Sequence, residues 1–93
     1  MPVLEHPEIE KRLAGMSGWS LAEGQISKTF MAATFHRAVA FVTQIGMLAE
    51  VADHHPDIDI RYNKVTVRLS THSEGGITEK DFALAEAMEL AFV

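Results

Sequence analysis

Hydrophobic residues change their spacing several times along the chain. Between Thr34 and Asp53 they recur every three or four positions, which predicts a long amphipathic helix with Thr34 as its N-cap. The helix is expected to end near His54-His55, because the residue before Pro56 is disfavoured in the helical conformation. Its apolar face is expected to carry Phe35, Ala38, Val39, Val42, Ile45, Ala49 and Ala52.

Two segments that flank this helix alternate apolar with polar residues, which is the pattern of β-hairpins. Residues 18–30 are expected to form the first hairpin, with Glu23-Gly24 at its turn. Residues 58–69 are expected to form the second, with Asn63-Lys64 at its turn. The apolar faces of the two strands in the second hairpin are expected to carry Ile58, Ile60, Tyr62, Val65, Val67 and Leu69.

Shorter helices are predicted at both ends of the chain. Residues 6–15 have Pro7 in the first helical turn and Gly15 at the end, which suits the two termini of a helix. Thr78 and Asp81 have the three-residue spacing of a capping box, which opens the last helix. One side of that helix is expected to carry Leu84, Ala85, Met88, Ala91 and Phe92.

These elements predict a single domain of the α+β class. A chain of 93 residues is too short for two independent hydrophobic cores, so residues 1–93 are expected to fold together. The predicted order is α-β-β-α-β-β-α. Two hairpins separated by a helix indicate one four-stranded antiparallel sheet with the helices packed on one face.

Composition argues against several classes of protein. The chain has no cysteine, which rules out disulfides and thiolate metal sites. A net charge of −5 without a Lys/Arg cluster argues against direct nucleic-acid binding. No apolar run is long enough for a membrane span and no secretory signal is visible, so a cytoplasmic protein without membrane attachment is expected. The open edges of an antiparallel sheet favour a homo-oligomer.

Three of the five histidines lie close together in sequence, at His54, His55 and His72. Neighbouring residues of an extended segment point to opposite sides, so His54 and His55 are poorly placed to bind one metal ion. An imidazole has an unperturbed pKa of about 6.5 and can donate or accept a proton near neutral pH. Acid/base chemistry therefore suits these residues better than metal binding.

Carboxylates close to the histidines admit two interpretations. Glu50, Asp53 and Asp81 could orient imidazoles or bind N–H groups of a substrate. Alternatively, His54-His55-Pro56 could merely end the long helix, and Asp81 could merely serve the capping box. No activated nucleophile stands out, which favours proton transfer without a covalent intermediate. The residues alone leave the catalytic and the structural interpretations open.

The full spacing resembles that of the pterin-4a-carbinolamine dehydratase family. The positions that carry the resemblance are Glu50, His54, His55, Pro56, Tyr62, His72 and Asp81. The segments YNKVTVRLSTH and GITEKDFALA are similar to the most typical stretches of that family. The resemblance covers nearly the whole chain and is strongest over residues 50–85. Many members carry a Trp shortly after the His-His-Pro, whereas this chain has Asp57 and Ile58, so the packing of that loop is expected to differ.

The resemblance implies a hydro-lyase, 4a-hydroxytetrahydrobiopterin dehydratase. Such an enzyme removes water from a 4a-hydroxytetrahydropterin and gives quinonoid dihydropterin. The reaction recycles the cofactor of aromatic amino acid hydroxylases, including the one that hydroxylates phenylalanine. No metal and no organic cofactor is implied, since the pterin is the substrate, and members of the family form homodimers or homotetramers. Other branches of the family imply an alternative, a non-catalytic binding, regulatory or assembly protein of the same fold.

The resemblance also implies roles for individual residues. His54 and His72 would be the acid/base pair, and His55 would mainly bind substrate at the catalytic centre. The other residues implied to bind or orient substrate are Glu50, Asp53, Pro56, Thr71, Ser73, Glu74 and Asp81. Some of them would act through backbone groups, and the carboxylates would position histidines or ring nitrogens.

Overall fold

Within residues 2–92, three α-helices and four β-strands follow one another in the predicted order, and a short 3₁₀-helix, η1, precedes the last helix. The structure is a computed structural model and describes residues 2–92. In chain order the elements are α1 (His6–Ala14), β1 (Ser20–Ala22), β2 (Gln25–Met31), α2 (Phe35–Ala52), β3 (Asp57–Arg61), β4 (Lys64–Leu69), η1 (His72–Glu74) and α3 (Glu79–Ala91). Within residues 2–92 no helix is both long and apolar enough to cross a membrane.

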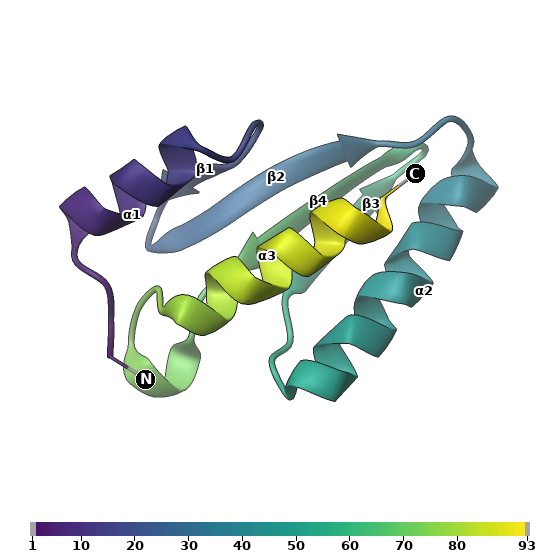
Figure 1. The fold of residues 1–93 in the computed structure, drawn as a ribbon. Helices are drawn as coiled ribbons and strands as arrows, with labels where there is room; N and C mark the ends of the chain where they lie inside the picture. The colour runs from purple at the N-terminus through teal and green to yellow at the C-terminus, as the bar shows by residue number, and fades with distance from the viewer. Residues whose placement is uncertain (1, 93) are drawn as a thin grey trace.

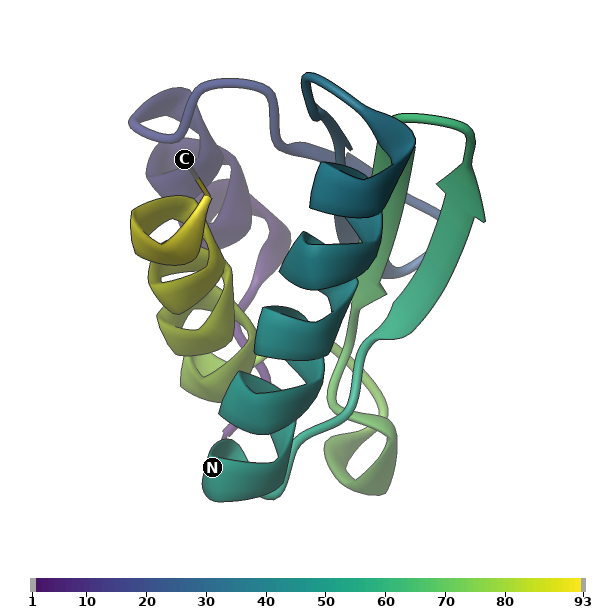
Figure 2. The ribbon, with the colours of Figure 1, turned by 90° about the vertical axis from the view of Figure 1, so that its right-hand side faces the viewer.

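The strands form one antiparallel sheet in the order β1-β2-β4-β3, so β4 lies inside the sheet and β3 at its edge. The helices lie on one face of this sheet (Figures 1 and 2). Val65, Val67 and Leu69 of β4 are fully buried, whereas Thr66 and Arg68 between them are only half-buried. The alternation along β4 thus turns one face of the sheet toward the helices, and the predicted α+β fold is confirmed.

The buried stripe of α2 differs in part from the predicted one. The buried residues are Ala38, Phe41, Ile45 and Ala49, of which the prediction left out Phe41. It was wrong at Phe35, Val39 and Ala52, which remain exposed. Successive helix residues are about 100° apart around the axis, so Val39 lies on the flank of a stripe that passes through Ala38.

The second hairpin turns one residue earlier than predicted. Arg61 pairs with Lys64, which leaves Tyr62 and Asn63 as the turn. Asn63 is held there because its side-chain amide donates to the Ala32 carbonyl (2.8 Å) and its own carbonyl accepts the Ala32 N–H (2.8 Å). Tyr62 consequently adopts a left-handed backbone (φ 52°) and is 69% exposed, instead of joining the apolar face of β3.

Arg12 ties the first helix to the last one. Its guanidinium donates two hydrogen bonds to Glu79 at the start of α3, one of them 2.7 Å long, and a third of 2.8 Å to Glu8 in α1. It also lies over the ring of Phe82, 5.4 Å from the ring centroid. The hydrogen bonds from Arg12 lower the pKa of Glu79 below its ordinary value, against a smaller opposing effect of desolvation.

Replacing Arg12 with Gln is expected to lower the melting temperature near neutral pH. In acid the difference in melting temperature between this variant and the wild type is expected to disappear. A carboxyl group whose pKa is lower in the folded protein stabilises the fold above its unfolded-state pKa, and the contribution disappears as the pH falls through the folded-state value. Both side chains are partly exposed, so the effect should be small and weakened by salt. Thermal unfolding across this pH range measures it.

Lys11→Gln is the matched control, because it removes an exposed cation from the same helix. It should unfold like the wild type at every pH. A difference between the wild type and Arg12→Gln that stayed constant down to strong acid would contradict the ion pair with Glu79.

Candidate active site

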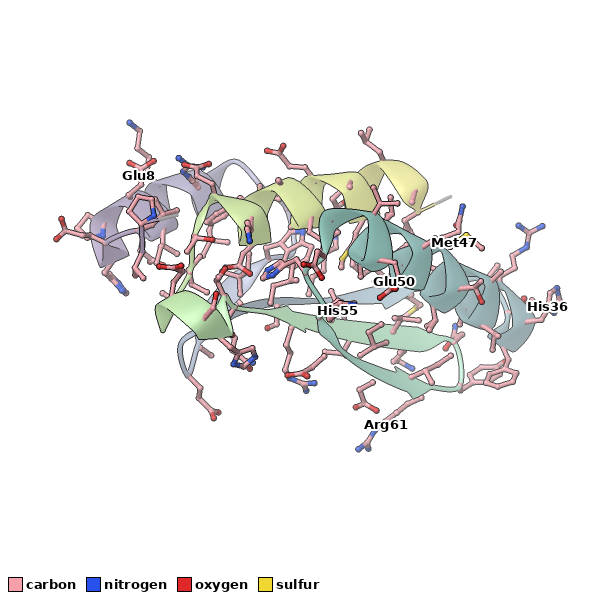
Figure 3. The ribbon with its side chains drawn as sticks, turned by 90° about the horizontal axis from the view of Figure 1, so that it is seen from below. Glu8, His36, Met47, Glu50, His55 and Arg61 are labelled. Atoms are coloured by element: carbon pink, nitrogen blue, oxygen red, sulfur yellow. The ribbon has the colours of Figure 1, made fainter. Side chains whose placement is uncertain are left out.

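Three segments that are distant in sequence lie at one end of the molecule. The C-terminal end of α2, η1 and the N-terminal end of α3 occupy this end in both ribbon views (Figures 1 and 2). His54 and His55 follow α2, His72 begins η1, and Asp81 lies in the first turn of α3. His36 lies toward the opposite end of α2, well away from His55 (Figure 3). The fold therefore brings the segments with the predicted histidines to the same end.

The end of α2 directs His54 into the interior. Asp53 adopts the left-handed conformation (φ 50°, ψ 46°). Its N–H donates to the carbonyl of Glu50 (3.2 Å), and the N–H of His54 donates to the carbonyl of Ala49 (3.0 Å). This pair of bonds is the Schellman pattern, which satisfies the last carbonyls of a helix. The chain reverses here, so that the side chain of Asp53 is exposed and that of His54 is buried.

His54 and Asp81 are in direct contact. The Nε2 atom of His54 lies 2.6 Å from Oδ1 of Asp81, although the residues are 27 positions apart. His54 is 8% exposed, and Asp81 is completely buried. An internal carboxylate without partners costs several kcal/mol, so Asp81 requires donors of this kind. The structure thus joins two of the predicted site residues inside the protein.

Asp81 serves the capping box and the imidazole with different oxygens. Its Oδ2 accepts the N–H of Thr78 (2.9 Å) and the hydroxyl of Thr71 (2.9 Å), while Oδ1 faces His54. The hydroxyls of Thr71 and Thr78 are 2.8 Å apart, and both side chains are buried. The predicted capping box is confirmed. The capping contact and the imidazole contact, which the sequence left as alternatives, are both present.

His55 points in another direction and has its own carboxylate. Its Nε2 lies 2.5 Å from Oε2 of Glu50, and both side chains are largely exposed. Figure 3 shows this pair near the end of α2. The two adjacent imidazoles therefore have separate acidic partners, one inside and one at the surface. Within residues 2–92 no three His, Cys, Asp or Glu side chains form a group that could hold a metal ion.

The loop with η1 is closed by the backbone of Thr71. The N–H of Thr71 donates to the carbonyl of Gly76 (2.8 Å), and its carbonyl accepts the N–H groups of Glu74 and Gly75 (3.0 Å each). The residues of η1, His72, Ser73 and Glu74, are exposed. Pro56, which follows the two histidines, is half-buried. The loop thus presents the third histidine to solvent on a short, hydrogen-bonded turn.

The predicted residues form two groups linked by hydrogen bonds. One is buried and contains His54, Asp81 and Thr71, and the other is the exposed pair of His55 and Glu50. The exposed side chains of Asp53, His72 and Ser73 lie outside these groups. The sequence did not indicate that Thr71 would reach Asp81, because this contact depends on how the loop after β4 meets α3.

A hollow of about 280 Å³ reaches His54 from the groove between α2 and α3. Its walls are mainly apolar, and Lys80 adds a cation. The lining residues are Leu48, Val51, Ala52, His54, Lys80, Ala83, Leu84 and Ala87. The sequence does not indicate that Lys80 lines this hollow, because the groove forms between helices whose relative placement no local pattern indicates.

Comparison with known proteins identifies the family. Residues 2–91 match the sequence profile of the family described as pterin 4 alpha carbinolamine dehydratase. The chain is 55% identical over 92 residues to a protein of Herpetosiphon aurantiacus that bears the name pterin-4-alpha-carbinolamine dehydratase provisionally, with 99% of this chain and 96% of that protein covered. The chain therefore belongs to the pterin-4-alpha-carbinolamine dehydratase family.

Solved structures show the same fold. A protein of Brucella melitensis, described as a transcriptional coactivator/pterin dehydratase, matches with a TM-score of 0.92 and 34% identity, over 98% of this chain and 99% of that chain. A pterin dehydratase-like protein, described as a RuBisCO assembly factor in the alpha-carboxysome, matches with a TM-score of 0.68 and 20% identity, over 82% and 90% of the two chains. The second likeness is one of fold alone.

Replacement of the two adjacent histidines is expected to affect stability very differently. The position of His54 at a helix end predicts that its replacement would change stability only slightly. The burial of its side chain predicts a large loss of stability instead. His54→Ala leaves Oδ1 of the internal Asp81 carboxylate without a donor, while Oδ2 keeps its bonds from Thr71 and Thr78, and should lower the free energy of unfolding by about 3 kcal/mol. His55→Ala removes an exposed contact and should cost less than about 0.5 kcal/mol. Urea unfolding of both variants measures the difference, and equal losses would contradict the buried contact.

Proposed function

We propose that the protein is a 4a-hydroxytetrahydropterin dehydratase that works by histidine acid/base catalysis. The buried contact of His54 with Asp81 carries the proposal, and membership of the family supports the class of reaction. Burying an imidazole with a carboxylate adds little to stability, because both groups lose their hydration to form one contact. The same pair is well suited to hold a proton carrier in a fixed orientation.

The proposed reaction requires two proton transfers. An acid protonates the hydroxyl on C4a, the C4a–O bond breaks, and water leaves. The electron pair of N5 forms the double bond between N5 and C4a, and a base takes the proton of N5. The products are water and quinonoid dihydropterin. One proton must then pass from the base to the acid before the next turnover.

His54 and His72 are the proposed acid/base pair. The side chain of His54 is buried, with one ring nitrogen in contact with Asp81, whereas that of His72 is exposed on the turn of η1. His55, paired with Glu50 at the surface, is proposed to bind the pterin. A positioned proton donor or acceptor typically contributes about 10²- to 10⁴-fold in rate. No metal and no organic cofactor takes part in this scheme, because the pterin is the substrate.

Other residues are proposed to bind or support the substrate. Glu50, Asp53, Pro56, Ser73 and Glu74 lie at least partly exposed at this end of the molecule. Asp81 and Thr71 are buried and hydrogen-bonded, which favours support of the histidines over side-chain contact with the pterin. The cellular role proposed for the reaction is recycling of the tetrahydropterin used by aromatic amino acid hydroxylases, phenylalanine hydroxylase among them.

A binding or assembly role is the second candidate. Exposed apolar side chains on α2 and α3 favour it, namely Met47 (65%), Val51 (90%) and Leu90 (89%). The Brucella melitensis relative is described as a coactivator as well as a dehydratase. Such a role does not depend on proton transfer, so an activity assay separates the two candidates.

Dehydration of 4a-hydroxytetrahydropterin, followed by stopped-flow absorbance, tests the proposed function. The wild type should accelerate the reaction above its spontaneous rate. His54→Ala and His72→Ala should lower kcat by about 10²-fold or more, since each removes a proton carrier. His55→Ala should raise KM more than it lowers kcat, because His55 mainly binds substrate.

His36→Ala is the matched control, since His36 is an exposed histidine near the other end of α2. It should behave like the wild type, and extensive chelation should leave the wild-type rate unchanged. Wild-type protein that gave no acceleration would overturn the dehydratase and favour the second candidate. Activity that chelation abolished and one metal restored would overturn the metal-free scheme.

The protein is also proposed to form a homo-oligomer, either a homodimer or a homotetramer. The edge strand β3 offers unpaired backbone groups, and its Ile58 and Ile60 are each 36% exposed. Light scattering at micromolar concentration should give a mass of at least two chains. Ile60→Lys at the sheet edge and Val51→Lys on α2 locate the interface, because only the variant inside it should reduce the mass. A monomer mass for the wild type would refute the assembly.

A further inference from the structure

The hydrogen bonds around Asp81 have a determined direction. The carboxylate accepts, so the hydroxyl hydrogen of Thr71 points to Oδ2 of Asp81. A hydroxyl has one hydrogen, and Thr78 must therefore donate to the oxygen of Thr71 across 2.8 Å. The oxygen of Thr78 in turn accepts the N–H of Lys80 (3.2 Å). All donors in this series of hydrogen bonds point toward one buried carboxylate, that of Asp81.

This direction also fixes the hydrogen on His54. A carboxylate accepts at both oxygens, so the ring nitrogen next to Oδ1 of Asp81, Nε2, must be a donor. In the neutral imidazole the other nitrogen, Nδ1, is then the acceptor. His54 would thus meet a substrate through Nδ1, with Nε2 committed to the interior.

Thr71 connects this arrangement to the loop of the third histidine. Its side chain donates to Asp81, whereas its backbone N–H and carbonyl close the turn that begins with His72. Thr71 is 3% exposed and uses its only hydroxyl hydrogen inside the protein. Its side chain is therefore placed to act on the histidines rather than on a ligand.

We propose that Thr71 is a positioning residue: through Asp81 it holds His54 in the Nε2–H form, so that Nδ1 faces the substrate, and through its backbone it sets the turn of His72. The catalytic part of this inference rests on the proposed dehydratase function. The hydrogen position on His54 does not, because it follows from contacts inside the protein. A purely structural Thr71 would stabilise the loop but would leave the imidazole unaffected.

The hydrogen position is measured by ¹⁵N NMR of the histidine side chains in the wild-type protein without substrate. At a pH where the His54 ring is neutral, Nε2 should give the signal of a protonated nitrogen and Nδ1 that of an unprotonated one. This measurement needs no variant and no activity. A spectrum with the hydrogen on Nδ1 overturns the proposal.

Two replacements at position 71 separate positioning from folding. Thr71→Val keeps the shape of the side chain but removes the donor that helps to hold the Asp81 carboxylate against His54. When the carboxylate turns away, Nε2 loses its acceptor and the second tautomer becomes populated, so the two His54 nitrogen signals should approach each other. Thr71→Ser keeps the hydroxyl and should restore the wild-type signals. The control is Thr29→Val, which removes a hydroxyl from an exposed cross-strand contact with Thr66 on the sheet (2.8 Å). It should leave His54 unchanged.

The dehydration assay completes the test. Thr71→Val should lower kcat by about 10-fold or more with little change in KM, since a small displacement of a reacting group is costly and the side chain does not touch substrate. Thr71→Ser should recover most of kcat. A Thr71→Val protein with unchanged His54 signals, or with a raised KM and a normal kcat, overturns the positioning role while the dehydratase stands. The wild-type protein could also show the expected His54 signals but no dehydratase activity. This result would support the assignment of the hydrogen to Nε2, and it would refute both the dehydratase function and the catalytic role of Thr71.

Discussion

The contact between the imidazole of His54 and the internal carboxylate of Asp81 sets conditions that the surrounding elements must meet together. A carboxylate without access to water needs donors on both oxygens. Thr78 supplies one from the start of α3, Thr71 supplies another from the loop after β4, and His54 supplies the third from the end of α2. Three segments that are distant in sequence are thereby held at one point, and the family's chemistry is proposed to occur beside it.

The sheet makes this meeting possible because β4 is one of its two inner strands and ends just before Thr71. β4 pairs with β2 on one side and with β3 on the other, so its end is fixed from both directions. β3 begins after Pro56, one residue beyond the histidine pair, which anchors the chain on the far side of His54 and His55. The exposed residues of the site are thus carried on short connections between rigid elements, which favours a constant geometry.

Features with a local cause could be predicted from the sequence. The presence of α2, its end before Pro56 and the capping box of Thr78 and Asp81 all depend on residues within one or two turns, and the structure confirms them. Features that depend on tertiary packing could not. No local pattern indicates which of the two adjacent histidines turns inward, because that depends on the left-handed Asp53 and on a partner 27 positions away. The turn at Tyr62 was misplaced for the same reason, since Asn63 is held by the distant Ala32.

Asp81 makes the first turn of α3 and the imidazole of His54 one cooperative unit. Helix ends ordinarily fray, and the first turn of a surface helix opens at little cost. If the first turn of α3 opened, the N–H of Thr78 and the carboxylate of Asp81 would separate, and His54 would lose its acceptor for as long as the opening lasted. Here the turn begins with Thr78 and Asp81 both completely buried, so water does not compete for the cap. The depth at which α3 starts therefore limits how often the histidine is out of place.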